Sequence, residues 1–453
     1  MTTIPKVATA LRDVLTTTAE AAAEASGFVR RRSKLSGALF VQTVVYGWLA
    51  TPLAGVQELS RMAGALGVPI SSQGLDQRFS MAAATCLQQV LAVAVQQLVA
   101  AEPVAVPLLH RFSGVYVQDS TSIALPAELA ADWPGCGNAS TPATASASLK
   151  LQVRLELTRG ELAGPVPHPG RVHDRAAPPV GTALPPGALF LADLGYFSLA
   201  HLRALAAEGV YWLTRLQVQT AVFDAADQRL DLLGWLRHHA PHPSMPVDVP
   251  VTLGAHDRLP ARLLALRVPS EVAEARRRKL HAEARRRGQT VSHDRLARAD
   301  WTILVTNVPP PLLTVPEALV VARARWQIEL LFKLWKSHGH LTSSRSRKTA
   351  RLLCEVFAKL LALLAQHWLC LLSCWRFPNR SLVRSAQVIR QFALALAIAS
   401  DSTSHLSTVI RRLVSTLASG ARIDRRRRRP GTWQLLLALD DAHDDPVTAD
   451  WAA

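Results

Sequence analysis

Cysteine is scarce in this sequence and follows no pairing pattern. The 453 residues include five cysteines, an odd number, with no CxxC pair and no pair of histidines at zinc-ligand spacing. This excludes the common structural zinc sites and a disulfide framework, and it is typical of reduced thiols in the cytosol. The five are Cys86, Cys136, Cys354, Cys370 and Cys374.

Segments typical of a leader peptide or a membrane span are also missing. Residues Met1–Ala25 lack a basic stretch followed by an apolar core. The most apolar late segment, Leu352–Trp375, contains four polar side chains that a bilayer would bury at high cost: Glu355, Lys359, Gln366 and His367. We therefore expect a buried helix in this segment and a cytoplasmic protein.

Acidic residues are the minority charge. The chain has 34 Asp and Glu against 51 Lys and Arg, which gives a formal net charge of +17. Such a charge repels itself unless a polyanion neutralises it, so nucleic acid is the expected partner. A basic protein from a proteome rich in Ala, Arg and Leu is the alternative. The hydrophobic content of 49% allows several buried cores and two to four domains.

Residues 1–105 form the first predicted domain, which we expect to be helical and to bind DNA. The segment has few strand signals. Within it, Gln57–Ser80 indicates a helix, a turn at Gly67–Pro69, and a second helix that begins at Ser71 or Ser72 as its cap. This is the outline of a helix-turn-helix, although two ordinary packed helices fit the same pattern equally well.

Short strands follow in residues 106–216, the first part of a predicted α/β core. Val115–Val117 is a short apolar run that predicts a strand ending at Asp119. Leu149–Leu157 alternates apolar and polar residues, which predicts a strand with one buried face.

A second strand end carries an aspartate in the same part of the chain. Ala188–Ala192 is a continuous apolar run that ends at Asp193. Ser198 is the expected cap of a helix that reaches Gly209, and Val210–Leu216 predicts the next strand. A strand, a helix and a strand in this order predict a parallel pair within a mixed sheet.

Residues 217–300 are predicted to be a β-rich insertion with basic helices. Val247–Leu253 and Arg262–Val268 indicate strands. Glu274–Arg287 is too charged for a core and has no bulky apolar stripe, so we interpret it as a helix that faces either solvent or DNA.

The α/β core resumes in residues 301–345, with a strand at Trp301–Asn307 and a long helix at Val315–Ser337. Residues 346–453 are predicted to be a helical C-terminal region for dimerisation or DNA contacts. The run Arg425–Arg429 within it either grips DNA or is a solvated run of charge.

Three acidic residues are the candidate catalytic group. Asp119 and Asp193 follow strands, and the ends of strands are where open α/β sheets gather ligands. Glu329 lies on the long helix, on one polar stripe with Arg325 and Lys336, since about 100 degrees separate successive helical residues. Turn or capping roles for the aspartates and a plain salt bridge for Glu329 are the alternatives.

Together, the three acids predict a metal site for phosphoryl transfer. Carboxylate oxygens suit Mg²⁺ or Mn²⁺, and two such ions about 4 Å apart activate an attacking hydroxyl and stabilise the leaving oxygen. The metal ligands and catalytic residues are therefore predicted to be Asp119, Asp193 and Glu329.

From about Arg30 to His340 the sequence resembles the bacterial insertion-sequence transposases of the Asp-Asp-Glu class, insertion sequence 4 type. Segments YVQDST at 116–121 and LADLGYFS at 191–198 are similar to the two Asp segments of this family. ARARWQIELLFKLWKS at 322–337 is similar to its signature of Tyr, two residues, Arg, three residues, Glu, six residues and Lys, with Ala322 in place of the Tyr.

The resemblance implies a ribonuclease H-like core, interrupted between Asp193 and Glu329 by a β-rich insertion. It further implies cleavage of DNA at transposon end inverted repeats, strand transfer into target DNA, two metal ions, a homodimer that bridges two ends, and a place at the bacterial nucleoid. Trp301 matches a tryptophan that can stack on a flipped base, although a core role fits it equally well. Candidate DNA contacts are Arg215, Arg325, Lys333 and Lys336.

Two other functions fit the same residues. A DNA-binding relative without catalysis would use only the basic residues. The presence of all three acids argues against this alternative, while Ala322 in place of the signature Tyr argues for it. A general nuclease of the ribonuclease H-like fold would cut DNA without a preference for element ends.

Overall fold

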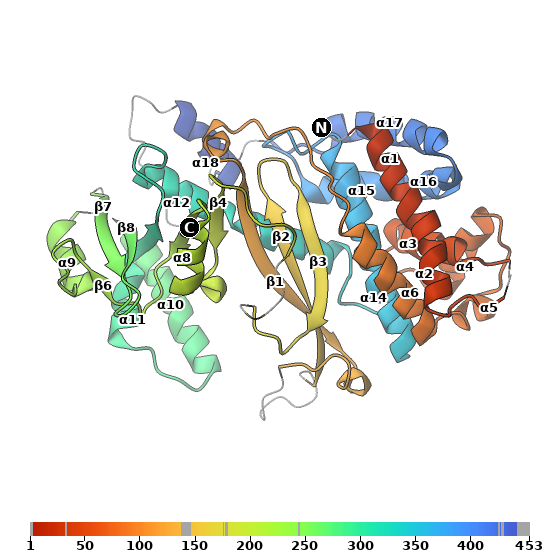
Figure 1. The fold of residues 1–453 in the computed structure, drawn as a ribbon, viewed down its shortest axis with the longest axis horizontal. Helices are drawn as coiled ribbons and strands as arrows, with labels where there is room; N and C mark the ends of the chain where they lie inside the picture. Colours follow the sequence, from red (N-terminus) through yellow and green to blue (C-terminus); the bar gives the residue numbers. More distant parts are fainter. Residues whose placement is uncertain are drawn as a thin grey trace. The chain divides into compact units, whose positions relative to one another are not determined.

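A computed structural model describes residues 3–31, 34–136, 146–174, 176, 180–242, 245–424, 426 and 430–441 (Figure 1). Contacts divide the chain into two compact units, each built from three separate segments. Unit 1 comprises Met1–Ala105, Asp119–Thr182 and Gln327–Asp424, and unit 2 comprises Val106–Gln118, Ala183–Trp326 and Arg425–Ala453. The predicted domain boundaries differ from this division and stay predictions.

Unit 1 is mainly helical. Its helices are α1 (Ile4–Asp13), α2 (Ala19–Ala25), α3 (Gly37–Ala50), α4 (Val56–Ala65), α5 (Ser72–Asp76), α6 (Met81–Ala94), α14 (Thr349–Leu371), α15 (Leu382–Gln391), α16 (Ala393–Ile398) and α17 (Thr403–Gly420). A π-helical turn at Val14–Thr18 joins α1 to α2. The predictions of a helical N-terminal segment and of helices after residue 346 are confirmed.

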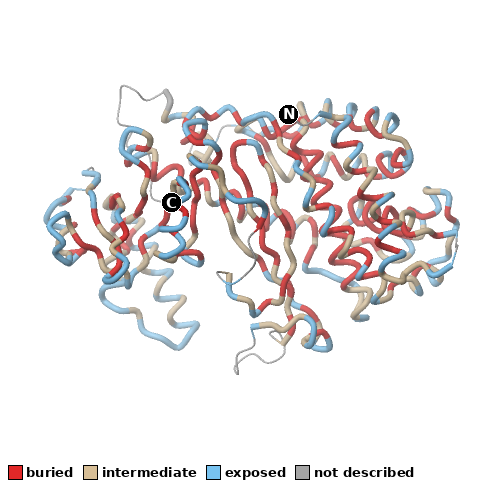
Figure 2. The backbone as a smooth tube through the Cα atoms, viewed as in Figure 1, coloured by how far each residue is buried: buried red, intermediate tan, exposed pale blue. Residues whose placement is uncertain are grey.

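Helix α14 is the central element of unit 1 and packs against α3 and α6. It is long and apolar enough to cross a membrane, but 94% of its apolar window is buried inside the structure. The buried stretch of this helix is red in Figure 2. The predicted buried helix is therefore confirmed.

The helix-turn-helix outline is present in unit 1, with a short second helix. Helix α4 ends at Ala65, Gly67 has a positive φ of 81°, and Ser71 caps α5 by accepting a hydrogen bond from the backbone N–H of Gly74. Helix α5 has five residues, which at about 1.5 Å per residue is under two turns. Its role in DNA binding stays a prediction.

The sheet of unit 1 consists of β2 (Ala147–Glu156), β3 (Leu162–Pro169) and the later part of β1 (Val115–Leu125), in the order β3-β2-β1. Strands β2 and β3 are antiparallel. The apolar face of β2 is fully buried, as the alternation predicted. Strand β1, however, continues to Leu125, so the prediction that it ends at Asp119 is wrong.

Unit 2 holds the larger part of the sheet, in the order β1-β4-β5-β9-β8-β7-β6. The remaining strands are β4 (Leu189–Ala192), β5 (Tyr211–Arg215), β6 (Val222–Phe223), β7 (Val247–Leu253), β8 (Leu259–Arg267) and β9 (Trp301–Thr306). Strand β4 is parallel to both β1 and β5, whereas β9, β8, β7 and β6 are antiparallel to their neighbours. The predicted parallel pair in a mixed sheet is confirmed.

The helices of unit 2 flank this sheet and its insertion. They are α8 (Leu199–Ala207), α9 (Leu232–His239), α10 (Ser270–Arg286), α11 (His293–Ala297), α12 (Val315–Ala324) and α18 (Thr432–Asp441), and α13 (Trp326–Lys333) begins in unit 2 and continues into unit 1. Helix α8 begins at the predicted cap, Ser198. Of the run Arg425–Arg429, only Arg426 lies within the described residues.

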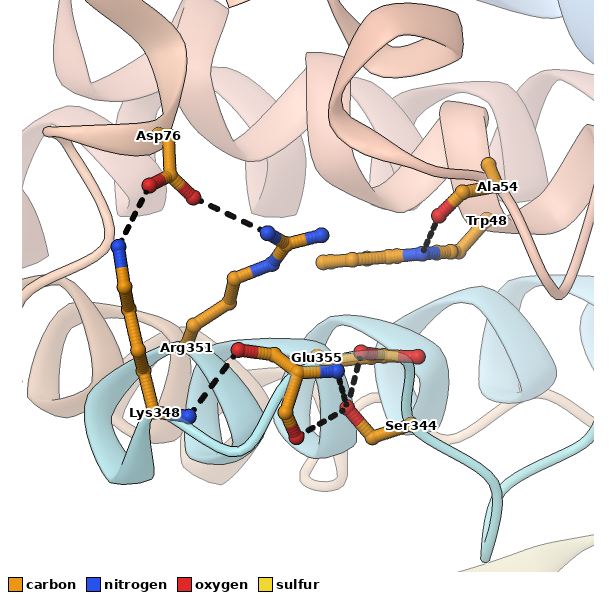
Figure 3. Close-up of polar contacts among 8 residues, drawn as sticks. Trp48, Ala54, Asp76, Ser344, Lys348, Arg351 and Glu355 are labelled. Carbon is orange, nitrogen blue, oxygen red and sulfur yellow. Dashed lines mark hydrogen bonds and ion pairs between the residues drawn. The ribbon is translucent and has the colours of Figure 1, made fainter. Parts of the chain in front are cut away.

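A buried ion pair on α14 holds the loop that precedes this helix. Lys359 Nζ lies 2.7 Å from Glu355 Oε1, and the two side chains are 2% and 5% exposed. Lys359 also donates to the carbonyls of His340 and Ser343, at 2.8 Å each. The hydroxyl of Ser344 donates to Glu355 Oε2 at 2.7 Å, a contact drawn in Figure 3.

We expect Glu355→Leu to lower the free energy of unfolding by about 3 kcal/mol, because Lys359 would remain buried without its counter-charge. The double variant Glu355→Leu/Lys359→Met should lose less than the single variant, since no unpaired charge is left inside. Urea unfolding followed by tryptophan fluorescence measures both. A double variant less stable than Glu355→Leu alone would contradict this account of the pair.

A second, more exposed cluster ties α5 to α14. The Asp76 carboxylate lies 2.8 Å from Lys348 Nζ and 3.0 Å from Arg351 Nη1 (Figure 3). The hydrogen bond from Lys348 lowers the pKa of Asp76, and the charges of both cations lower it further. The cluster therefore contributes stability only while the carboxylate is ionised.

We expect Asp76→Asn to lower the free energy of unfolding by about 1 kcal/mol near neutral pH, where Asp76 is charged. The difference from the unchanged protein should shrink as the pH falls below about 3.9, the ordinary Asp value, and through the lowered pKa of Asp76. Urea midpoints measured across this range test the sign. A difference that stays constant in acid would show that the charge of Asp76 is not responsible.

Candidate active site

Asp193 directly follows a strand that is buried along its whole length. All four residues of β4 are buried, and the strand has parallel partners on both sides. Its carboxyl end is therefore at the edge where open α/β sheets gather ligands. The side chain of Asp193 is 40% exposed, so its oxygens are accessible to solvent.

The signature helix begins with a capping box. The backbone N–H of Thr314 donates to Glu317 Oε2 at 2.8 Å, and Pro316 lies in the first turn of α12. Glu317 also pairs with Arg111 at 2.9 Å. Regular α-helix stops at Ala324, resumes at Trp326 as α13, and ends in a π-helical turn at Leu334–His338. The predicted long helix is confirmed, with an irregularity at Arg325.

Arg325 connects the second Asp segment with the signature helix. Its Nη1 lies 3.6 Å from Asp193 Oδ1, and its side chain is 24% exposed. Glu329, a half-buried residue, follows one helical turn after Arg325 in sequence. Arg325 therefore ties the second Asp segment to the signature helix within unit 2.

Asp119 lies within β1 rather than at its end, and its neighbour Ser120 links it to a second acid. The Ser120 N–H donates to Asp119 Oδ1 at 2.7 Å, and the Ser120 hydroxyl donates to Asp174 Oδ1 at 2.8 Å. Lys150 Nζ donates to Asp174 Oδ1 at 3.1 Å and to the carbonyl of Val172 at 2.6 Å. The backbone of Asp174 is also held, since Gln152 donates to its carbonyl at 3.1 Å.

The sequence analysis did not single out Lys150 and Asp174. Lys150 lies on the polar face of β2, where a lysine usually faces solvent, and its side chain is instead only 12% exposed. Asp174 lies in the segment after β3, where no periodic pattern marks it. The one sequence signal that could have pointed to Lys150 is that it is a basic residue on the strand that follows the first Asp segment.

The three predicted carboxylates are divided between the units. Asp119 and Glu329 belong to unit 1, and Asp193 and Arg325 belong to unit 2. Within neither unit do three His, Cys, Asp or Glu side chains of the described residues form a group that could hold a metal ion. The triad therefore stays a prediction, and its donor oxygens are of the kind that hard divalent cations prefer.

The predicted DNA contacts differ in exposure. Arg215 and Lys333 are exposed, and Lys336 is half-buried, with a pKa lowered by that burial. Trp301 is 4% exposed and belongs to the hydrophobic core of unit 2. A ring packed in this way is not available to stack on a base, so the structure favours the core role of Trp301.

Comparison with known proteins identifies the family. A family profile described as a transposase DDE domain matches residues 110–365, more than half of the chain. The chain belongs to the DDE transposases. The matched segment contains Asp119, Asp193 and Glu329, together with the insertion between the last two.

Three relatives are similar to this DDE transposase over about three quarters or more of their own length. It is 25% identical over 417 residues to the transposase for insertion sequence element IS231B of Bacillus thuringiensis subsp. berliner, covering 87% of this chain and 84% of the relative. It is 26% identical over 360 residues to that for IS231F of Bacillus thuringiensis subsp. israelensis, covering 74% and 73%. For IS231C of subsp. berliner the identity is 27% over 369 residues, covering 76% and 75%.

Family membership fixes the general function. The protein is an enzyme of DNA transposition that acts on DNA and depends on divalent metal ions. Its mixed sheet with flanking helices is consistent with the ribonuclease H-like fold of DDE transposases. The predicted fold class and enzyme class are confirmed.

We expect Asp174→Asn to reduce DNA nicking by roughly 10- to 100-fold, as is usual when a residue that orients a metal ligand is changed. The variant should need more metal ion for half-maximal nicking, because Asp119 is less well held, while its melting temperature changes little. A metal titration of nicking by both proteins tests this. Loss of activity with an unchanged metal requirement would assign Asp174 a purely structural role.

Proposed function

We propose that Asp119, Asp193 and Glu329 together hold two Mg²⁺ or Mn²⁺ ions and that this site cleaves DNA at transposon ends. The freed 3′ hydroxyl then attacks target DNA in the same site. Two such ions supply activation of the attacking hydroxyl and stabilisation of the leaving oxygen. All three side chains offer oxygen ligands, the donors that these ions prefer.

The observation that carries this proposal is the Arg325–Asp193 ion pair at 3.6 Å. It links two segments that are far apart in sequence and that both match the family signature. Arg325 neutralises Asp193 when no other cation does so. Its planar guanidinium also suits a phosphate, because it can donate two parallel hydrogen bonds.

Three basic residues are the proposed DNA contacts. Arg215 follows the buried part of β5 and is exposed, and Lys333 lies on the exposed face of α13. Lys336 is half-buried, and burial lowers the pKa of its amine. An anionic partner such as a phosphate would stabilise the charged form of this amine. We propose that these side chains bind phosphates of the terminal inverted repeats.

The assembly is proposed to be a homodimer that bridges two transposon ends at the bacterial nucleoid. Five cysteines are described as free and four of them are buried, in keeping with a cytoplasmic location. Crosslinking of the protein in the presence of end duplexes tests the dimer.

A catalytically inactive DNA-binding relative is the second candidate. The observation in its favour is Ala322, which stands where the family signature has Tyr. Ala322 has no side chain with which to hydrogen-bond a phosphate, so end binding is the step it would weaken. Ala322→Tyr should then raise nicking at element ends without changing the metal requirement.

We expect Asp119→Asn, Asp193→Asn and Glu329→Gln each to abolish metal-dependent nicking and strand transfer, since each removes one charged metal ligand. DNA binding without divalent metal should persist. The assay uses a labelled end duplex with Mg²⁺ or Mn²⁺, and Ca²⁺ as a non-catalytic ion. Random duplex as a competitor distinguishes a transposase from a general nuclease.

Matched controls are the exposed acids Asp132 and Glu208, changed to Asn and Gln. These variants should nick as the unchanged protein does, because neither residue is part of the proposed site. An Asp119→Asn protein that nicked equally well would refute the assignment.

A further inference from the structure

Helix α10 of the insertion has one exposed side on which four basic residues and two alanines lie together with His281 and two acids, Glu271 and Glu274. At about 100 degrees per residue, the exposed positions of this 17-residue helix fall on one side. In Figure 2 the helix is pale blue and tan, with little red. The positions that matter are Ala275, Arg278, Lys279, Ala282, Arg285 and Arg286, which we name the α10 basic face.

The opposite side of α10 is fixed to its own unit. Arg276 Nη1 donates to the carbonyl of Trp301 at 2.9 Å, and its Nη2 donates to Thr302 Oγ1 at 3.0 Å. Arg277 forms an ion pair with Asp300. These two guanidiniums therefore anchor the helix to β9 and to the turn before it, and they orient the α10 basic face outward.

The α10 basic face carries more positive charge than the acidic side chains around it neutralise. Two exposed acids, Glu271 and Glu274, lie on the same side of the helix, against the four cations of the face. Glu274 lies 3.8 Å from Arg278, in a pair whose side chains are 63% and 73% exposed. Solvent screens such a pair strongly. Lys279, Arg285 and Arg286 have no acidic partner among the residues that the structure describes. Folding alone leaves these charges unneutralised.

Arg215, at the end of β5, is a further cation close enough to α10 to affect Arg276. Burial lowers the pKa of Arg276, and the charge of Arg215 at the end of β5 lowers it further. Arg215 is itself exposed. Positive charge therefore continues from the α10 basic face toward β5.

The chemistry of this face favours a polyanion over a protein or a lipid surface. Its apolar residues are alanines, whereas protein interfaces gather aromatic residues and amphipathic membrane helices need a bulky apolar face. Alanine at the centre also allows a ligand's backbone to come close to the helix. Seven residues separate Arg278 from Arg285, about 10 Å along the axis, which is enough to meet more than one phosphate of a DNA duplex.

We propose that the α10 basic face binds the phosphate backbone of duplex DNA. This inference rests on the proposed function in one respect, namely that DNA is the substrate of the protein. It adds a contact surface in the insertion that is separate from the three carboxylates and from the signature helix. Its contribution is to affinity rather than to the choice of sequence, because phosphates carry no sequence information.

The test compares two pairs of adjacent arginines in the full-length protein. The variant Arg285→Ala/Arg286→Ala removes two charges from the α10 basic face, and Arg411→Ala/Arg412→Ala removes two exposed charges from α17. Binding of a labelled random-sequence duplex is measured by fluorescence anisotropy over a series of salt concentrations without divalent metal. Alanine is the best helix former, so neither change should unfold its helix.

We expect the α10 variant to bind about tenfold more weakly at low salt. The negative slope of log K against log salt should become shallower by roughly 1.8, or 0.9 for each lost phosphate contact. The α17 variant should keep both values. The conservative change Arg285→Lys/Arg286→Lys should restore most of the affinity, which a defect in folding would not allow.

Equal affinities and slopes for the α10 and α17 variants would overturn the inference. The inference would also be overturned if the α10 variant bound duplex DNA normally but lost binding to an acidic protein or to RNA. Failure here is distinct from failure of the proposed function, which is judged by metal-dependent nicking in the Asp119→Asn protein. Each of the two can fail while the other holds.

Discussion

The contact between Arg325 and Asp193 is the interaction on which the candidate site depends. An aspartate at the end of a buried strand needs a cation or hydrogen-bond donors nearby, and here the cation is supplied by Arg325, between α12 and α13. The contact ties the second Asp segment to the signature helix four residues before Glu329 in the sequence.

Strand β4 is the element that makes this contact possible. Its four residues are all buried, and hydrogen bonds to a parallel strand on each side hold the strand in place. The position of Asp193, directly after the strand, is therefore fixed within unit 2. The irregularity at Arg325, between α12 and α13, lies at the same place. Interruptions of regular helix often occur at functional positions, where a side chain must point in a direction that a continuous helix does not offer.

The sequence predicted the elements with strong periodicity and missed those that depend on tertiary contacts. Continuous apolar runs and strict alternation located β4 and β2, and Ser198 as a capping residue located α8. Strand β1 was predicted too short because Ser120, Thr121 and Ser122 interrupt the apolar run. The alternation nevertheless continues, since Thr121, Ile123 and Leu125 are buried. Polar residues on a partly covered strand conceal such a pattern.

The site was predictable in part for the same reason. Asp119, Asp193 and Glu329 have a recognisable local context, and so has Arg325. Asp174 has none, because it reaches Ser120 only through the folding of the segment after β3. The burial of Trp301 was equally invisible, since an aromatic residue that opens a strand can face either side of a sheet.

The composition of α10 has a consequence for how such a protein can change over time. Its anchoring side chains and its outward side chains are different residues, so substitutions on the outside leave the attachment of the helix intact. Charge can be added or removed there one residue at a time, with almost no cost in stability. A mobile element with this arrangement has a simple means of adjusting how firmly its enzyme holds the genome while the chemistry stays the same.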